Sequence, residues 1–372
     1  MASNLVENLG KELEQIDREY ASDFAGHSRL TRDISQMDRM IKRAATVVDQ
    51  IDRIPSAAQG PELTRVRDAA KASLELYKTE RAAIAKAQEV GPAFEQFSGE
   101  ATSANFVFAR YMRHFAGRDR STRDVALLGE LVEELRQIDK RMTNLLAEQK
   151  SPDFEKDRTV VRENLAQYQK EIDLIETAQS TGTPDEQASI LASLANNQFA
   201  VYQAHFAGEP RVSRRPALLM RVVASLKKVR ERMVALRASG LKEEFNEKNV
   251  GIVEDRLSTY ETELAEVRKV RQATPMTDIM GELGGAANKL FDEYRANFAD
   301  KPRSQADATR LANICDKLGE IRRQMLDMSL AEDSDMNHKN LDIVTEQLVM
   351  FEGEFEAVVR AQATAATNTN TK

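Results

Sequence analysis

The amino-acid sequence predicts an all-α protein built from four tandem copies of one unit of about 91 residues. Three observations predict this fold: two separate sets of recurring aromatic residues keep the same period, and the apolar residues between them alternate in steps of three and four. The 30% charged share with only 16 Gly and 9 Pro is typical of long solvated helices. We expect units at 1–91, 92–182, 183–273 and 274–362, and a disordered tail at 363–372.

The first landmark is a Tyr that is followed four residues later by Phe-Ala-Gly and then by two arginines at three-residue steps. The first copy consists of Tyr20, Phe24, Ala25, Gly26, Arg29 and Arg32. The Phe residues of the four copies are Phe24, Phe115, Phe206 and Phe298, at offsets of 91, 91 and 92. The fourth copy departs from the pattern, with Asp300 in the Gly position and Ala306 in the position of the second Arg.

A second landmark lies far from the first one in each unit. It consists of Leu74-Tyr77, Leu165-Tyr168, Leu257-Tyr260 and Leu348-Phe351, at offsets of 91, 92 and 91. The junctions between units repeat as well, as Gly91-Pro92, Thr183-Pro184 and Thr274-Pro275. Each junction combines a helix stop with a proline at the first position of the next helix, so we expect a break there.

Each unit reads as three helices of about 20 to 30 residues, or roughly 30 to 45 Å each. The first helix ends at the Tyr and Phe landmark, and Thr31, Thr122 or Ser213 is expected as the N-cap of the second. The third helix contains the later Tyr. Breaks between the second and third helices are expected at Pro55 to Gly60, Ser151-Pro152, Ser239-Gly240 and Ser329 to Asp335.

The second helix of every unit has one narrow apolar stripe, which predicts packing of helix on helix. In the second unit this stripe consists of Leu128, Leu131, Leu135, Ile138, Met142 and Leu145. The layout resembles the spectrin-type repeat, in which three helices form a left-handed coil and units follow one another in an elongated line. The likeness is one of architecture over residues 1 to 362, since the chain has no Trp whereas spectrin-type units have one in their first helix.

The Phe-Ala-Gly-x-x-Arg-x-x-Arg segment, which we call the corner, has two interpretations. In the structural one, Gly ends the first helix, and the arginines bond exposed carbonyls or acidic neighbours. In the other, the arginines bind an anion or an acidic peptide beside a helix N-terminus, with the third unit as the first place to look. The candidate binding residues are Arg29, Arg32, Arg120, Arg123, Arg211, Arg214, Arg215 and Arg303.

No residue pattern predicts catalysis, a metal or a cofactor. Four His and one Cys do not supply an ordinary zinc site, and no Glu-x-x-His pair is present for a di-iron bundle. Cys315 stands where the other units have Ile41, Val132 and Val223, so we expect a core residue. We therefore expect a protein that is not an enzyme.

The charge pattern indicates which kinds of binding partner to expect. The net charge of −7 argues against binding to nucleic acid, and the single Cys and the lack of a long apolar segment favour a soluble cytoplasmic protein. Only the third unit is net positive, with 15 basic and 12 acidic residues. The basic residues of its second helix are Arg214, Arg215, Arg221, Lys227, Lys228, Arg230, Arg232 and Arg237.

This basic helix is either a solvated face or a docking surface for the acidic fourth unit of a second copy, around Glu332, Asp333 and Asp335. Head-to-tail docking of that kind does not close on itself and would build a filament. The leading hypothesis is thus a scaffold, structural or filament-forming protein that acts through protein contacts. The alternative is a module that binds anions or acidic peptides at its corners.

Overall fold

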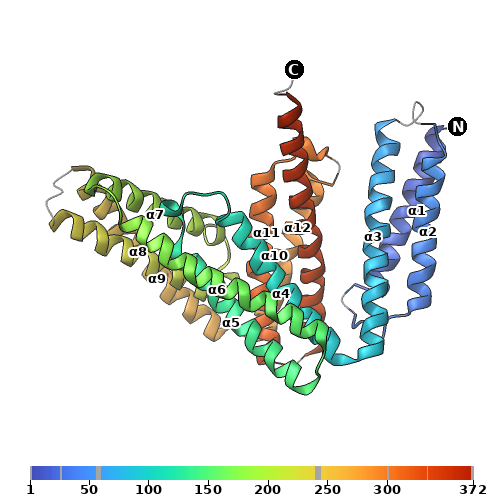
Figure 1. Cartoon of the computed structure of the whole chain (residues 1–372), viewed down its shortest axis with the longest axis horizontal. Coiled ribbons are helices and arrows are strands. Elements are labelled where there is room, and N and C mark those ends of the chain that lie inside the picture. Colours follow the sequence, from blue (N-terminus) through green and yellow to red (C-terminus); the bar gives the residue numbers. More distant parts are fainter. Residues whose placement is uncertain are drawn as a thin grey trace.

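The computed structural model describes residues 2–25, 27–55, 60–238, 244–299, 301–332 and 334–369, and within them the chain forms twelve α-helices and no strand (Figure 1). The prediction of an all-α fold is confirmed. The helices are α1 (Ala2–Asp23), α2 (Ile34–Asp52), α3 (Pro61–Val90), α4 (Pro92–His114), α5 (Val125–Glu148), α6 (Pro152–Ser180), α7 (Pro184–His205), α8 (Pro216–Ala238), α9 (Glu244–Ala273), α10 (Met276–Asn297), α11 (Ala308–Ala331) and α12 (Asp335–Thr369).

The contacts between helices repeat along the chain. Helices α1, α2 and α3 contact one another, and so do α4 to α6, α7 to α9 and α10 to α12. The second and third helices of each set make the most extensive contact, and the apolar cores of the sets lie inside them. This recurring pattern of helix pairs indicates a structural repeat, at the period that the sequence shows.

The predicted apolar stripes lie in these cores. On α5, Leu128, Leu131, Leu135, Ile138 and Met142 are fully buried, and the corresponding residues of α2, α8 and α11 are buried in the same way. Cys315 is buried too, so its expected place in the core is confirmed. Burying one such Leu or Ile stabilises the folded chain by roughly 1.5–3 kcal/mol.

The second helices begin two residues later than expected. Asp33, Asp124 and Asp307 are the N-caps, and the Asp124 side chain accepts hydrogen bonds from the backbone N–H groups of Ala126 and Leu127. Thr122, the expected cap, belongs instead to a short 3-10 helix, η2 (Arg120–Thr122), and its hydroxyl donates to the carbonyl of Asp119. In the first, second and fourth units an Asp side chain accepts hydrogen bonds from free helix N–H groups at this later start, whereas in the third unit α8 begins at Pro216, a residue type favoured at the first helical position.

The expected breaks at the unit junctions are confirmed. Gly91 alone separates α3 from α4, with a φ of 92° that favours glycine. Thr183 forms a capping box with Glu186 at the start of α7. Pro275 precedes α10, which begins one residue later, at Met276.

The expectation that the four units form one elongated line is wrong. In a linear array each unit contacts only its sequence neighbours, but α4 of the second unit packs against α11 of the fourth, and Arg32 of the first unit reaches Glu346 on α12. Figure 1 shows α7–α9 extending to one side, while α10–α12 stand between them and α1–α3. The physical reason is α11, on which Glu320, Arg322 and Arg323 form a polar face that is buried against other units.

Some expectations concern the ends and breaks of the chain. Helix α12 continues through Thr369, so the segment from Ala363 is helical where we expected a disordered tail, in line with the high helix propensity of its alanines. Residues 370–372, Gly26, Asp300, Asp333 and the Ser239-Gly240 break lie outside the described residues. No helix in the described ranges is both long enough and apolar enough to cross a membrane.

Candidate functional site

At each corner, the arginines contact a glutamate of the third helix in the same unit. Arg29 donates to both carboxylate oxygens of Glu80, at 2.7 and 2.9 Å, and Arg32 contacts the same carboxylate. The corresponding contacts join Arg120 and Arg123 to Glu171, Arg211 and Arg214 to Glu263, and Arg303 alone to Glu354. In the third unit, the hydrogen bond from Arg211 and the charge of Arg214 lower the pKa of Glu263, against the effect of its partial burial.

Stacked aromatic rings close the same end of each unit. The rings of Tyr202 and Tyr260 lie 3.9 Å apart between centroids, and Phe206 packs beside them in the core. Eight residues after the corner glutamate of each unit, a side chain of the third helix donates a hydrogen bond to the backbone after the corner, as Gln179 does to the carbonyl of Arg123 at 2.7 Å. The corner is therefore a clamp that joins the three helices at one end.

This clamp bears on the predicted anion site. An anion at a corner would have to compete with a carboxylate that already bonds both arginines, so the geometry favours the structural interpretation, and anion binding there stays a prediction. Sequence reasoning missed the glutamates. They recur as Tyr-x-x-Glu or Phe-x-x-Glu at offsets of 91, 92 and 91, which is the signal that could have found Glu80, Glu171, Glu263 and Glu354.

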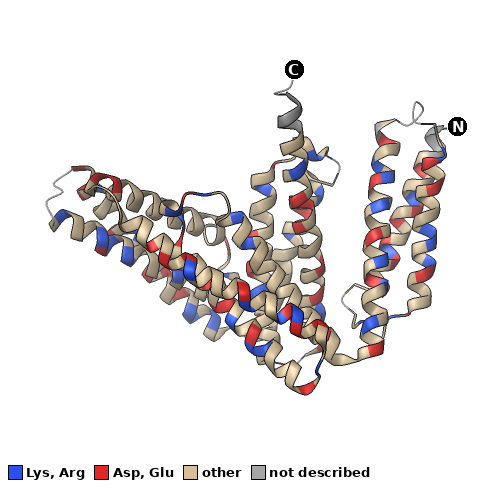
Figure 2. Cartoon of the chain, in the orientation of Figure 1, with Lys and Arg blue, Asp and Glu red and all other residues tan. Residues whose placement is uncertain are grey.

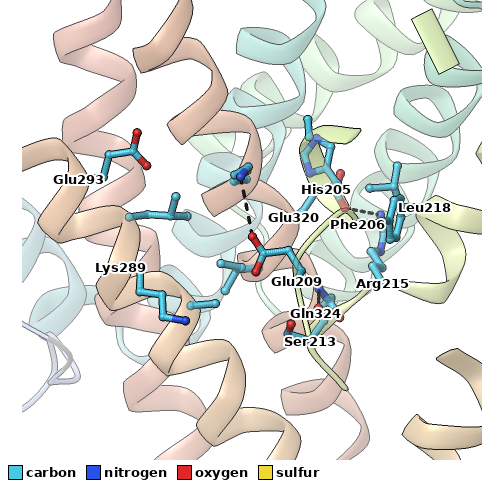
Figure 3. Close-up of a pocket in the computed structure, with 15 residues that line it drawn as sticks. His205, Phe206, Glu209, Ser213, Arg215, Leu218, Lys289, Glu293, Glu320 and Gln324 are labelled. Carbon is cyan, nitrogen blue, oxygen red and sulfur yellow. Dashed lines mark hydrogen bonds and ion pairs between the residues drawn. The ribbon is translucent and has the colours of Figure 1, made fainter. Parts of the chain in front are cut away.

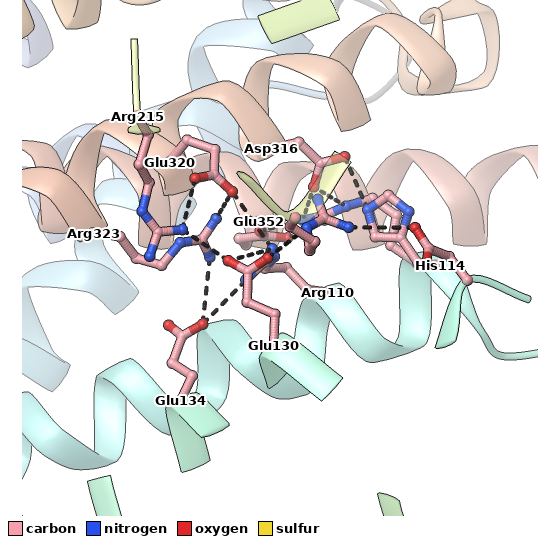
Figure 4. A network of polar contacts seen from close by, with 12 residues as sticks. Arg110, His114, Glu130, Glu134, Arg215, Asp316, Glu320, Arg323 and Glu352 are labelled. Atoms are coloured by element: carbon pink, nitrogen blue, oxygen red, sulfur yellow. Dashed lines mark hydrogen bonds and ion pairs between the residues drawn. The ribbon is translucent and has the colours of Figure 1, made fainter. Parts of the chain in front are cut away.

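A second cluster of charges lies where three units meet on α11, and we call it the α11 junction (Figure 4). Its arginines come from α4, from α11, and from just before and within the first two turns of α8, and its carboxylates come from the N-cap and first half of α5 and from α11. The members are Arg110, Arg215, Arg221, Arg323, Asp124, Glu130, Glu134 and Glu320. Four positive and four negative charges therefore balance within the cluster.

Glu130, Glu134 and Glu320 each contact arginines of more than one unit. Arg215 of the third unit lies 2.8 Å from Glu130 of the second and 3.1 Å from Glu320 of the fourth. Arg110 lies 3.1 Å from Glu134 and 3.5 Å from Glu320, and Arg323 contacts both of these glutamates. Removing Glu130, Glu134 or Glu320 would therefore take one of the ion-pair partners from buried arginines in two units at once.

The arrangement changes how the carboxylates titrate. Burial and the nearby Glu320 raise the pKa of Glu130, but Arg110, Arg221 and Arg323 outweigh them and lower it to about 2. Burial also raises the pKa of Glu320. The charges of Arg323, Arg215 and Arg110 outweigh that effect, so the pKa of Glu320 is lowered. Both carboxylates are therefore ionised at neutral pH and hold their arginines in place.

A smaller group of charges continues the contact between the second and fourth units. Arg113 at the end of α4 donates to Asp316 on α11 at 3.0 Å and to both oxygens of Glu352 on α12 at 2.7 and 3.0 Å. His114 lies 3.1 Å from the other oxygen of Asp316. The Arg113 guanidinium also sits 5.5 Å from the centre of the Phe355 ring.

The basic helix α8 is partly used inside the molecule. Arg221 contacts Asp124 and Glu130 of the second unit, and Arg232 donates to the carbonyl of Gln179 at 2.6 Å. Figure 2 shows acidic residues interspersed with basic ones along the helices. The face expected either in solvent or against a second copy therefore contacts other units of the same chain at Arg215, Arg221 and Arg232.

A cleft of about 170 Å³ lies beside the α11 junction, between the corner of the third unit and helices α10 and α11 (Figure 3). Its apolar wall consists of Phe206, Leu218, Leu290 and Ile321 together with two alanines. The polar residues on the lining are His205, Glu209, Ser213, Arg215, Lys289, Glu293, Lys317, Glu320 and Gln324. Burial lowers the pKa of His205, although Glu320 and Asp316 oppose this effect, so its ring is neutral near pH 7.

Within the described ranges, no three or more His, Cys, Asp or Glu side chains are grouped so that they could hold a metal ion. The predicted binding residues do not form one site: Arg29, Arg120, Arg211 and Arg303 lie at four separate corners, and Arg215 alone joins the α11 junction and the cleft. No protein-family model, no curated protein and no solved structure matches this chain.

Proposed function

We propose that the chain is a non-enzymatic scaffold or filament-forming protein that acts through contacts of its outer helix faces with other protein surfaces. The observation behind this proposal is that many charged side chains pair within the molecule, while some apolar side chains stay exposed. At the corners and the α11 junction they pair with one another and join helices and units, whereas apolar side chains remain exposed on outer faces. A rigid frame with unpaired apolar faces suits a protein that organises partners.

We infer that each unit is a three-helix bundle of the spectrin type. The mutual contacts of the three helices in every set and the buried stripes on their second helices support this inference. The short breaks between units, as at Gly91, end one set of three helices and begin the next, which also supports a division into bundles. Four such bundles offer several outer faces for binding.

The exposed apolar residues lie at heptad spacing on the third helices. On α6, Val160 and Leu174 are two heptads apart and 43% and 38% exposed. On α12, Met336 and Met350 have the same spacing and are 64% and 43% exposed. We call these two pairs of exposed residues the α6 stripe and the α12 stripe, because apolar side chains at heptad spacing on an outer face are what a partner helix packs against.

Sedimentation velocity over roughly 1–100 µM, with negative-stain imaging, tests this proposal under the mass-action behaviour expected of association. We expect either self-association that grows with concentration or retention of a partner protein from lysate. The double variant Val160→Glu and Leu174→Glu should reduce the contact, because it puts charge on the α6 stripe. Arg162→Glu is the matched control, since residue 162 is exposed on the opposite side of the same helix.

The contrary result is specific. A chain that sediments as a monomer at every concentration and retains no protein from lysate contradicts the scaffold proposal. If contacts form but respond equally to Val160→Glu with Leu174→Glu and to Arg162→Glu, the α6 stripe is not the surface involved. In that case the α12 stripe is tested by Met336→Glu with Met350→Glu.

A further inference from the structure

We propose that the cleft between the third-unit corner and helices α10 and α11 binds a small organic anion, with one carboxylate or phosphate group on a short apolar body. This inference is independent of the scaffold proposal. It rests on three observations: the size of the cleft, its apolar wall, and the pairing of its charged side chains. The carboxylates of the lining have cationic partners, whereas some of its basic side chains have none within the described residues.

The space fits a compact molecule. Its volume of about 170 Å³ is close to the roughly 150 Å³ of an apolar cavity that holds benzene. Phe206 and Leu218 from the third unit and Leu290 and Ile321 from the fourth form the apolar wall. One ring or a short branched chain would therefore fill the cleft and bury its apolar surface.

The carboxylates of the lining already have cationic partners. Glu320 contacts Arg215 at 3.1 Å and also contacts Arg323, and Glu293 accepts a hydrogen bond from Arg310 at 2.7 Å. Glu209 lies 3.9 Å from Lys317, which is a long contact. A cationic ligand would thus compete with an existing partner at each of these three carboxylates.

The basic groups of the lining are less occupied. Lys289 and His205 make no hydrogen bond or ion pair with any residue in the described part of the chain, and Lys317 has only the long contact with Glu209. In Figure 3, His205 comes from the third unit and Lys289 from the fourth, so the two stand on different walls of the cleft. Within the described residues Lys289 is a positive charge without an ion-pair partner, and the neutral His205 ring adds one N–H donor, so these groups favour an anion.

Because its walls come from two units, an occupant would bridge them. An anion that bonds Lys289 on α10 and His205 at the end of α7 would add a contact between the third and fourth units, next to the α11 junction. Binding should therefore also raise the resistance of this interface to thermal unfolding, as for any ligand that prefers the folded state.

The experiment uses the full chain with four probes at constant ionic strength: benzoate, phenyl phosphate, benzyl alcohol and inorganic phosphate. Titration calorimetry and the thermal midpoint are measured for each. We expect benzoate or phenyl phosphate to bind with a Kd of about 10 mM or tighter, as the efficiency of small ligands allows, and at least tenfold more tightly than benzyl alcohol. The comparison of benzoate with phenyl phosphate shows which head group the cleft prefers.

Variants connect the binding to the cleft. Lys289→Glu should abolish binding of the anionic probe because it reverses the charge of an exposed side chain that packs in no core. Ala286→Phe should block it by filling the space beside Leu290. Lys339→Glu is the matched control, since it makes the same charge reversal at an exposed lysine of α12 outside the cleft, and it should bind like the parent chain.

Three results with the organic probes would overturn the proposal. They are equal binding of benzyl alcohol and benzoate, unchanged binding in Lys289→Glu, and no binding of either anionic probe at roughly 50 mM, well above the expected Kd. None of them bears on assembly, which sedimentation measures separately. Binding of inorganic phosphate as tight as that of phenyl phosphate would also contradict it, because the apolar wall would then contribute nothing.

Discussion

At the scale of single residues, charge pairs decide how the units are built and joined. Each corner places two arginines on one glutamate, except in the fourth unit, where Ala306 replaces the second arginine and Glu354 contacts Arg303 alone. The chain therefore allows a clamp with two arginines, in the first three units, to be compared with a clamp that has one arginine, in the fourth. A buried pair contributes little net stability, but losing one partner leaves the other without compensation.

This comparison gives a prediction. Glu171→Ala removes the partner of both Arg120 and the largely buried Arg123, and we expect it to lower the free energy of unfolding by about 2–4 kcal/mol. Glu354→Ala removes the partner of Arg303 alone, and that side chain is half-exposed. We therefore expect it to lower the free energy of unfolding by about 1 kcal/mol or less. Urea unfolding followed by circular dichroism measures both. Equal losses in the two variants would show that the clamp depends on the glutamate and not on the number of arginines.

At the scale of helices, the features that could be predicted from the sequence are those that depend on a local residue pattern. The apolar stripes, the three helices of each unit and the breaks at Gly91 and Thr183 follow from spacing and from the conformations of Gly and Pro, and the structure contains them. The second-helix starts were misplaced because Thr122 and Asp124 are both good caps, and sequence spacing does not say which of them the chain uses.

The α11 junction was not predictable in the same way. Glu320, Arg322 and Arg323 look like ordinary polar residues on the outer side of an amphipathic helix. Their burial depends on α4, α5 and α8, which lie 70 or more residues away in the sequence. Charge complementarity between distant helices leaves no period in the sequence, so local spacing gives no sign of this buried face.

A prediction at this scale concerns Gly91, which alone connects α3 and α4. A Cβ at this position would meet no other atom within 4 Å, but the φ of 92° is unfavourable for any other residue. We expect Gly91→Ala to destabilise the first two units by about 1–3 kcal/mol through backbone strain alone. The matched change Gly129→Ala, in the second turn of α5 where a Cβ also meets no atom within 4 Å, should instead stabilise the chain by roughly 0.5–1 kcal/mol. Thermal unfolding of both variants checks the signs, and stabilisation by Gly91→Ala would contradict the strain argument.

At the scale of the whole molecule, the chain folds back so that its fourth unit contacts the other three. The second and third units are attached to the fourth through the α11 junction, by several buried charges. The first unit is attached at one end, through the Gly91 connection, the hydrogen bonds of Ser28 with Glu95, and the 3.2 Å contact between Arg32 and Glu346. The first unit is thus held to α12 by fewer charges than the others are held to α11.

The Arg32 and Glu346 contact predicts how the molecular shape responds to one substitution. Glu346→Lys would place a cation against Arg32, which keeps its bond to Glu80, so the first unit should stay folded while its contact with α12 is lost. We expect small-angle scattering to show a larger radius of gyration and maximum dimension, with unchanged helix content by circular dichroism. Glu356→Lys makes the same charge change at an exposed position of α12 and should leave the scattering curve as it is. Identical curves for the two variants would mean that the first unit is positioned by its connection to α4, with no part played by α12.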